Sequence, residues 1–173
     1  MDITIRRGTP ADARLLADLA ASTFREAFAA DNRPEDMALH VSRSYGVYQQ
    51  EAELANPEMT TLLAEVDGQP AGYAQLRASA VPDCITGVTP LEVWRFYVAA
   101  PWHGLGVAHA LMKGVEMEAW AQEAHTLWLG VWERNERAKA FYRKCGFADV
   151  GSQVFVLGTD AQTDRIMVRS LPS

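Results

Sequence analysis

A turn with two glycines joins an apolar strand to a helix, and its residues are of the kind that binds a diphosphate. The segment 96–108 reads FYVAAPWHGLGVA, with Gly104 and Gly106 in the turn and the small Ala108 just after it. Glycines let backbone N–H groups approach a bulky anion closely, and the helix that follows directs the positive end of its dipole at the anion. Taken alone, however, such a turn more often only reverses the chain, so the prediction depends on a second segment.

The second segment, 127–147, reads as a strand, a short helix and a glycine stop. Asn135 is a typical helix cap, because its side chain can accept a hydrogen bond from the first turn. Gly146 suits the left-handed position that ends a helix, with Phe147 as the hydrophobic contact that follows it. We therefore predict a strand–helix–strand crossover, and hence a parallel strand pair, between 91 and 132, followed by this capped helix.

Together the two segments resemble the GNAT superfamily of acetyl-CoA-dependent N-acyltransferases. In that superfamily the first carries Arg/Gln-x-x-Gly-x-Gly/Ala, matched here by His103, Gly106 and Ala108. The second carries Asn-x-x-Ala-x-x-x-Tyr, which begins here at Asn135. His103 is a departure from the pattern. A histidine lacks the fixed charge of arginine, so its contact with a phosphate is expected to be weaker or to depend on pH.

The resemblance implies an α/β (α+β) fold. It has a mixed, mostly antiparallel central sheet flanked by helices, in which parallel strands at 91–99 and 126–132 splay to admit acetyl-CoA. Val98 is then expected to offer backbone groups to the pantetheine arm and an N–H to the developing oxyanion. For Lys144 the alternative is an ordinary solvated lysine at a helix end. The residues that the resemblance assigns to acetyl-CoA binding are Tyr97, Val98, His103, Gly104, Leu105, Gly106, Val107, Ala108, Asn135 and Lys144.

Glu92 is the candidate general base. A lysine-type amine has a pKa near 10.4, so only about one molecule in a few thousand is neutral at pH 7, and a base in the site raises that fraction. Glu92 lies six residues before Val98, where some GNAT enzymes carry a catalytic glutamate. The alternative is a structural ion pair with Arg95, Arg77 or another neighbour.

Tyr142 is the candidate general acid. It matches the tyrosine that in GNAT enzymes stands near the coenzyme sulfur and protonates the departing thiolate. Its phenol, with a pKa near 10, can pass a proton to a thiolate whose conjugate acid lies near 8.5 only slightly uphill. The alternative is that Tyr142 simply belongs to the core of an amphipathic helix.

A narrower resemblance, to bacterial spermine/spermidine N-acetyltransferases, covers blocks at 23–37, 127–133 and 162–167. A polyamine would suit acidic groups near the acceptor wall, which the segment 34–56 is expected to form. The alternative is that these groups form an ordinary solvated helix face. The acidic candidates are Glu26, Asp31, Glu35 and Asp36.

Composition narrows the class of protein further. The 173 residues are 49% hydrophobic, which fits one domain spanning 1–173. With 22 acidic and 16 basic residues, the net charge of −6 argues against nucleic-acid or anionic-membrane partners. Two cysteines, Cys84 and Cys145, show no metal-ligand or disulfide pattern, and no long apolar run or signal segment is seen. We expect a cytoplasmic protein without a metal, and homodimers are common among relatives of this kind.

Periodicity predicts the remaining elements. Thr9-Pro10-Ala11-Asp12 is a helix start, Gly46 a helix break, and Asp67-Gly68 the turn of a hairpin. The predicted elements are a strand at 3–6, a helix from 10 to 30, one or two helices within 34–56, a hairpin at 61–78, a loop at 80–90, strands at 91–99 and 126–132, helices at 104–122 and 135–145, and an antiparallel pair at 150–157 and 165–168.

The resulting hypothesis is direct transfer of an acetyl group to a primary amine of a small molecule, with a polyamine as one candidate, in a ternary complex. Glu92 acts as base and Tyr142 as acid. The alternatives are acetylation of a protein N-terminus, an antibiotic or an amino-acid-like amine, and a non-catalytic protein that binds or senses acyl-CoA.

Overall fold

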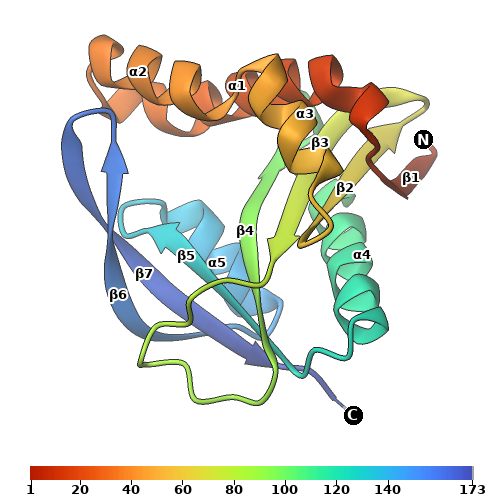
Figure 1. The fold of residues 1–173 in the computed structure, drawn as a ribbon, viewed down its shortest axis with the longest axis vertical. Helices are drawn as coiled ribbons and strands as arrows, with labels where there is room; N and C mark the ends of the chain where they lie inside the picture. The colour runs from red at the N-terminus through yellow and green to blue at the C-terminus, as the bar shows by residue number, and fades with distance from the viewer. Residues whose placement is uncertain (173) are drawn as a thin grey trace.

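The computed structural model, which describes residues 1–172, contains a seven-stranded mixed sheet in the order β1-β2-β3-β4-β5-β7-β6 (Figure 1). The strands are β1 (Ile3–Arg7), β2 (Met59–Val66), β3 (Gln69–Arg77), β4 (Pro90–Val98), β5 (Thr126–Trp132), β6 (Ala148–Leu157) and β7 (Asp160–Ser170). The helices are α1 (Ala13–Phe28), α2 (Pro34–Ser44), α3 (Val47–Ala55), α4 (Val107–Ala121) and α5 (Glu136–Lys144), with single 3-10 turns at Pro10–Asp12, Ala29–Asp31 and Ala100–Trp102.

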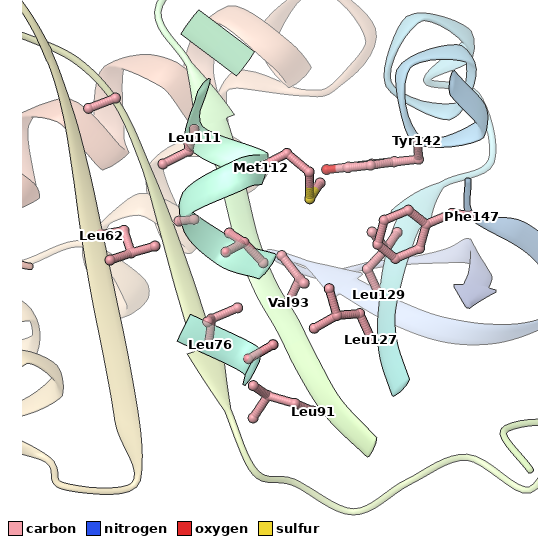
Figure 2. Close-up of a cluster of buried hydrophobic side chains, with 14 of the residues drawn as sticks. Leu62, Leu76, Leu91, Val93, Leu111, Met112, Leu127, Leu129, Tyr142 and Phe147 are labelled. Carbon is pink, nitrogen blue, oxygen red and sulfur yellow. The ribbon is translucent and has the colours of Figure 1, made fainter. Parts of the chain in front are cut away.

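The two faces of the sheet carry separate cores. On one face α4 and α5 pack against the strands, as in Figure 2, where Leu111 and Met112 of α4 lie beside Val93 of β4 and Tyr142 of α5 points towards them. On the other face the apolar side of α1, with Phe24 at its centre, packs over the sheet together with residues of α2 and α3. Successive side chains on β4 and β5 therefore alternate between the two faces of the sheet.

The parallel pair β4–β5 is short and then opens. Its register covers only three positions, from Pro90↔Thr126 to Glu92↔Trp128. Beyond Glu92, β4 keeps its partner β3 as far as Val98, and β5 keeps its partner β7 as far as Trp132. Figure 1 shows the two strands diverging from this point. The predicted mixed, mostly antiparallel sheet with one splayed parallel pair is confirmed.

Several element boundaries differ from the sequence prediction. α4 begins at Val107, not at residue 104, because Gly104 (φ +76°) and Gly106 (φ +87°) are both left-handed and hold the chain out of the helix. β7 spans 160–170 instead of 165–168, because its polar first half pairs residue by residue with β6. The predicted break at Gly46, the Asp67-Gly68 hairpin and the left-handed stop at Gly146 are confirmed.

None of the helices within residues 1–172 combines the length and the apolar character that crossing a bilayer requires.

Candidate active site

A cavity of about 1190 Å³ occupies the gap between β4 and β5. Its wall includes the turn before α4, one side of α5, and residues of α1 and α2 on the opposite face of the sheet. The cavity therefore passes through the sheet where the strands separate. Groups from both helical layers can act on one molecule held there.

The turn before α4 provides the anion-binding end. Gly104 and Gly106 both line the cavity, and no heavy atom lies within 4 Å of the position that a Cβ would take at either residue. No side chain caps the N-terminus of α4, so the first N–H groups of this 15-residue helix are available to a ligand. These features fit the diphosphate of a coenzyme A thioester.

His103 lies in the cavity wall but is already partly engaged. Its Nε2 lies 2.6 Å from the carbonyl oxygen of Val98, which accepts the hydrogen bond, so the proton is on Nε2. The contact ties the turn to the end of β4 and leaves Nδ1 as the ring atom for any ligand. The predicted phosphate contact of His103 stays a prediction.

The start of α5 combines a structural and a ligand-facing role. The side chain of Asn135 accepts a hydrogen bond from the N–H of Ala138 at 3.1 Å, which confirms the predicted cap. Asn135 and Lys144 both line the cavity. So does Arg137, a cation that the sequence analysis did not single out. Arg137 lies one helical turn before Phe141, on the face of α5 towards the cavity. This spacing in the sequence could have identified it as a site residue.

Glu92 is buried, with 5% of its surface exposed, and its carboxylate is held in place. The Nε of Arg77 donates to Oε1 at 2.6 Å, and the hydroxyl of Ser79 donates to the same oxygen at 2.9 Å. Leu91 and Val93 pack beneath α4, so Glu92 faces the other layer. Of the two arginines considered, Arg77 is the partner, whereas Arg95 pairs with Glu53 at 2.6 Å. The ion pair is present, and the role of Glu92 as base stays a prediction.

Tyr142 lies in the core beneath α5 and also lines the cavity, so both interpretations of this residue describe its position. Its ring contacts Phe96 and Phe147 at centroid distances of 6.0 and 5.8 Å. Burial raises the pKa of Tyr142 well above its usual value, so the phenol is protonated throughout the physiological range. The raised pKa also makes the phenol a weaker acid than a free tyrosine, so proton transfer to the thiolate is more uphill than its usual pKa implies. The role of Tyr142 as general acid stays a prediction.

Asp164 is a cavity residue that the sequence analysis did not select. It lies on β7 opposite Trp132 of β5 and is 8% exposed. Burial raises the pKa of Asp164 to about 6, and the negative charge of Glu133 adds to this effect. Within residues 1–172 its carboxylate has neither a hydrogen-bond donor nor an ion-pair partner. The pairing of β5, β7 and β6 brings it to the site. In the sequence it lies within the block 162–167 of the narrower resemblance, which assigns it no role.

The predicted acidic wall is not assembled. Glu26 lines the cavity, but Oε2 accepts a hydrogen bond from the N–H of Ala100 at 3.0 Å. Asp36 is buried beneath the β6–β7 turn, where it accepts two hydrogen bonds from Thr159 at 2.7 and 2.8 Å. Asp31 faces Arg134 at 3.6 Å, and Glu35 is exposed. Glu26 and Asp36 thus serve the local structure, whereas the exposed Asp31 and Glu35 fit the alternative of a solvated face.

Comparison with known proteins agrees with this site. Residues 19–147 match the model of the Acetyltransferase (GNAT) family, and the chain belongs to that family. It is 36% identical over 160 residues, covering 92% of this chain and 98% of the relative, to an uncharacterized N-acetyltransferase of Mycobacterium tuberculosis. It is 31% identical over 160 residues, 88% of this chain and 90% of the other, to the aminoglycoside N(6')-acetyltransferase type 1 of Stenotrophomonas maltophilia.

The fold also matches solved structures. The PaiA N-acetyltransferase of Thermoplasma acidophilum in complex with coenzyme A superposes with a TM-score of 0.79 at 20% identity, over 99% of this chain and all of that one. The protein is thus an N-acetyltransferase, and acetyl-CoA is its co-substrate.

Proposed function

We propose that the protein transfers the acetyl group of acetyl-CoA directly to a primary amine of a small molecule, with both substrates bound at once. One observation carries the proposal: a single cavity joins the glycine turn on one face of the sheet to buried carboxylates on the other. An amine that enters from the α1 side meets the thioester in the gap between β4 and β5. No nucleophilic side chain of the enzyme is needed for direct attack.

The residues divide into three roles in this proposal. The backbone around Gly104 and Gly106 holds the diphosphate, and the backbone of Val98 faces the pantetheine arm and the developing oxyanion. Tyr142 protonates the thiolate that leaves. A carboxylate on the α1 side of the sheet takes the proton of the amine, and Glu92 is the one that the sequence predicts.

The acceptor is a cationic amine of modest size. The acceptor side of the cavity is lined by aromatic side chains, among them Phe28, Trp132 and Phe155, beside the carboxylate of Asp164. Such a wall favours an ammonium group through cation–π contact and charge. A polyamine is one candidate. An amino sugar is the second candidate, because one relative is named an aminoglycoside acetyltransferase. Cytoplasmic location and a homodimer remain predictions from the sequence.

Thiol release from acetyl-CoA tests the proposal. The purified enzyme is supplied with spermidine, kanamycin, lysine and a peptide with a free N-terminus, each in turn, and the products are identified by mass spectrometry. We expect release with spermidine or kanamycin at least a hundredfold above the rate without an amine. Binding of acetyl-CoA in calorimetry without turnover of any amine would overturn the proposal in favour of a binding or sensing role.

A further inference from the structure

We propose that Asp164, rather than Glu92, accepts the proton of the attacking amine, on the opposite side of the gap from Tyr142. The inference rests on the proposed function and names the base of that same site.

The position of Asp164 depends on a missing side chain. On β5, Trp128, Gly130 and Trp132 share one face of the sheet, and Gly130 leaves the middle of that face open. A Cβ at residue 130 would lie 3.1 Å from Oδ2 of Asp164 and 2.5 Å from Nε2 of Gln153. Both side chains therefore lean over Gly130 and into the cavity, which all three residues line.

The carboxylates of Asp164 and Glu92 differ in what already binds them. Oε1 of Glu92 already accepts hydrogen bonds from Arg77 and Ser79, so this oxygen is occupied by groups of the protein. Asp164 has no such donor among the residues described, so its oxygens are free to accept a proton from a substrate. A carboxylate buried without a partner is costly, and its retention beside a cavity is typical of a functional group.

The charged and titratable groups around Asp164 favour a base that works near neutral pH. On β5 and just beyond it, Glu133 contributes the negative charge that acts with burial to raise the pKa of Asp164 to about 6. On β6 the facing group is the neutral amide of Gln153. From α2, His40 lines the same cavity, and burial together with the charge of Arg95 lowers its pKa to about 4, so it is neutral there.

Among the described residues, no cation in the remaining elements of the wall pairs with Asp164. From β4, Arg95 also lines the cavity, but its guanidinium pairs with Glu53 at 2.6 Å. From α1, Glu26 is bound to the N–H of Ala100. From β4, Tyr97 is the titratable group that senses Asp164. Loss of water around its hydroxyl raises the pKa of Tyr97 well above the usual value. The charges of Tyr45, Tyr142 and Asp164 add to this, and the charge of Arg95 opposes it. Asp164 and Tyr142 therefore both lie within electrostatic reach of Tyr97, one from each face of the sheet.

The proton transfers balance with these two groups. The nitrogen–carbon bond forms as the neutral amine attacks the acetyl carbon, and the carbon–sulfur bond breaks. The nitrogen gives its extra proton to the carboxylate of Asp164, and the phenol of Tyr142 gives its proton to the thiolate. Asp164 then returns a proton to the tyrosinate through solvent, so both side chains end as they began. The products are the acetamide and the free thiol.

The test compares two changes of carboxylate to amide on the same face of the sheet, Asp164→Asn and Glu92→Gln. The exposed Asp160→Asn on the same strand is the control. The kcat and kcat/KM are measured from pH 5 to 10 with the amine of the panel that reacts fastest. We expect Asp164→Asn to lower kcat by about a hundredfold or more and to remove the limb that rises near pH 6. Binding of acetyl-CoA in calorimetry stays within about threefold. Glu92→Gln and Asp160→Asn keep that limb.

A kcat for Asp164→Asn within tenfold of the wild type, with the limb intact, overturns the inference. So does loss of the limb in Glu92→Gln alone, which identifies Glu92 as the base. Either result leaves the proposed function standing, because the wild-type enzyme still acetylates an amine. Failure of the wild-type enzyme to acetylate any amine of the panel overturns the proposed function itself, and this inference with it.

Discussion

The Nε of Arg77 lies 2.6 Å from Oε1 of Glu92, so the carboxylate that the sequence predicts as a base is half of an ion pair between neighbouring strands. Arg77 also lies over the ring of Trp94, 3.8 Å from its centroid. The pair is attached to β4 at the last position where that strand still contacts β5. It therefore stabilises the point at which the sheet begins to open.

Removing the arginine charge should destabilise the protein. Arg77→Met keeps most of the aliphatic stem but leaves Glu92 buried without its cation, and we expect a loss of about 1–3 kcal/mol in the free energy of unfolding. Urea unfolding measures it. The double change Arg77→Met/Glu92→Gln should recover most of the loss, because no buried charge is left alone. A single mutant as stable as the wild type would show that the pair contributes nothing.

Removing the Asp164 carboxylate should have the opposite effect on stability. Its pKa is raised in the folded state to about 6 from 3.8, so the folded protein binds this proton more tightly than the unfolded chain. The buried carboxylate therefore destabilises the folded protein once it is ionised. This destabilisation grows as the pH rises from about 4 to 6 and is fully present above pH 6. About two pKa units correspond to roughly 3 kcal/mol.

We therefore expect Asp164→Asn to be more stable than the wild type by roughly 2–3 kcal/mol at pH 7.5, with the difference vanishing near pH 4. Urea unfolding of both proteins across this range measures it. A difference that does not change with pH would contradict the raised pKa.

Filling the space at Gly130 should impair acetyl transfer without affecting the coenzyme end. In Gly130→Ala the new methyl displaces the Gln153 amide and crowds Asp164. We expect kcat to fall by about tenfold or more, because small misplacements of a reacting group are costly. Calorimetry should show unchanged binding of acetyl-CoA. Gly46→Ala, at a helix start with open space around it, is the control. Equal kinetics in both variants would argue against a role for this face of β5.

The left-handed turn before α4 should be required for binding acetyl-CoA. Gly106→Ala meets no steric neighbour but forces an L-residue into φ near +87°, which costs about 1 kcal/mol or more and tends to reorient the first N–H groups of α4. We expect binding to weaken about tenfold in calorimetry. Gly68→Ala is a matched control, since Gly68 has φ +80° and open space but lies in the β2–β3 turn. Equal weakening in both would attribute the effect to general loss of stability.

Removing the Tyr142 hydroxyl should slow the reaction and leave binding intact. Tyr142→Phe keeps the contacts with Phe96 and Phe147, and we expect kcat to fall by more than tenfold with acetyl-CoA affinity unchanged. Tyr48→Phe, at an exposed position, is the control. A fall in kcat of less than tenfold would show that Tyr142 acts only as a core residue.

Local chemistry predicts much of the fold, and it predicts the residues proposed to bind the coenzyme. Gly104, Gly106 and Asn135 act through backbone conformation or a hydrogen bond within one turn, so their residue types alone indicate what they do. Gly46 and the Asp67-Gly68 turn are local in the same way. The start of α4 was misplaced by three residues, because the sequence does not reveal that both glycines adopt the left-handed conformation.

The acceptor end depended on the tertiary structure. Whether Glu92 pairs with Arg77 or Arg95 is decided by the register of β3 against β4, and Asp36 serves a turn that is 123 residues away in sequence. Asp164 enters the cavity because β7 lies between β5 and β6 and because Gly130 has no side chain. Residue type and spacing determined where a phosphate could bind, since such a site is built from backbone N–H groups of residues adjacent in the sequence. Only the folded sheet decided which carboxylate is left unpaired, since burial and charge depend on contacts between distant strands.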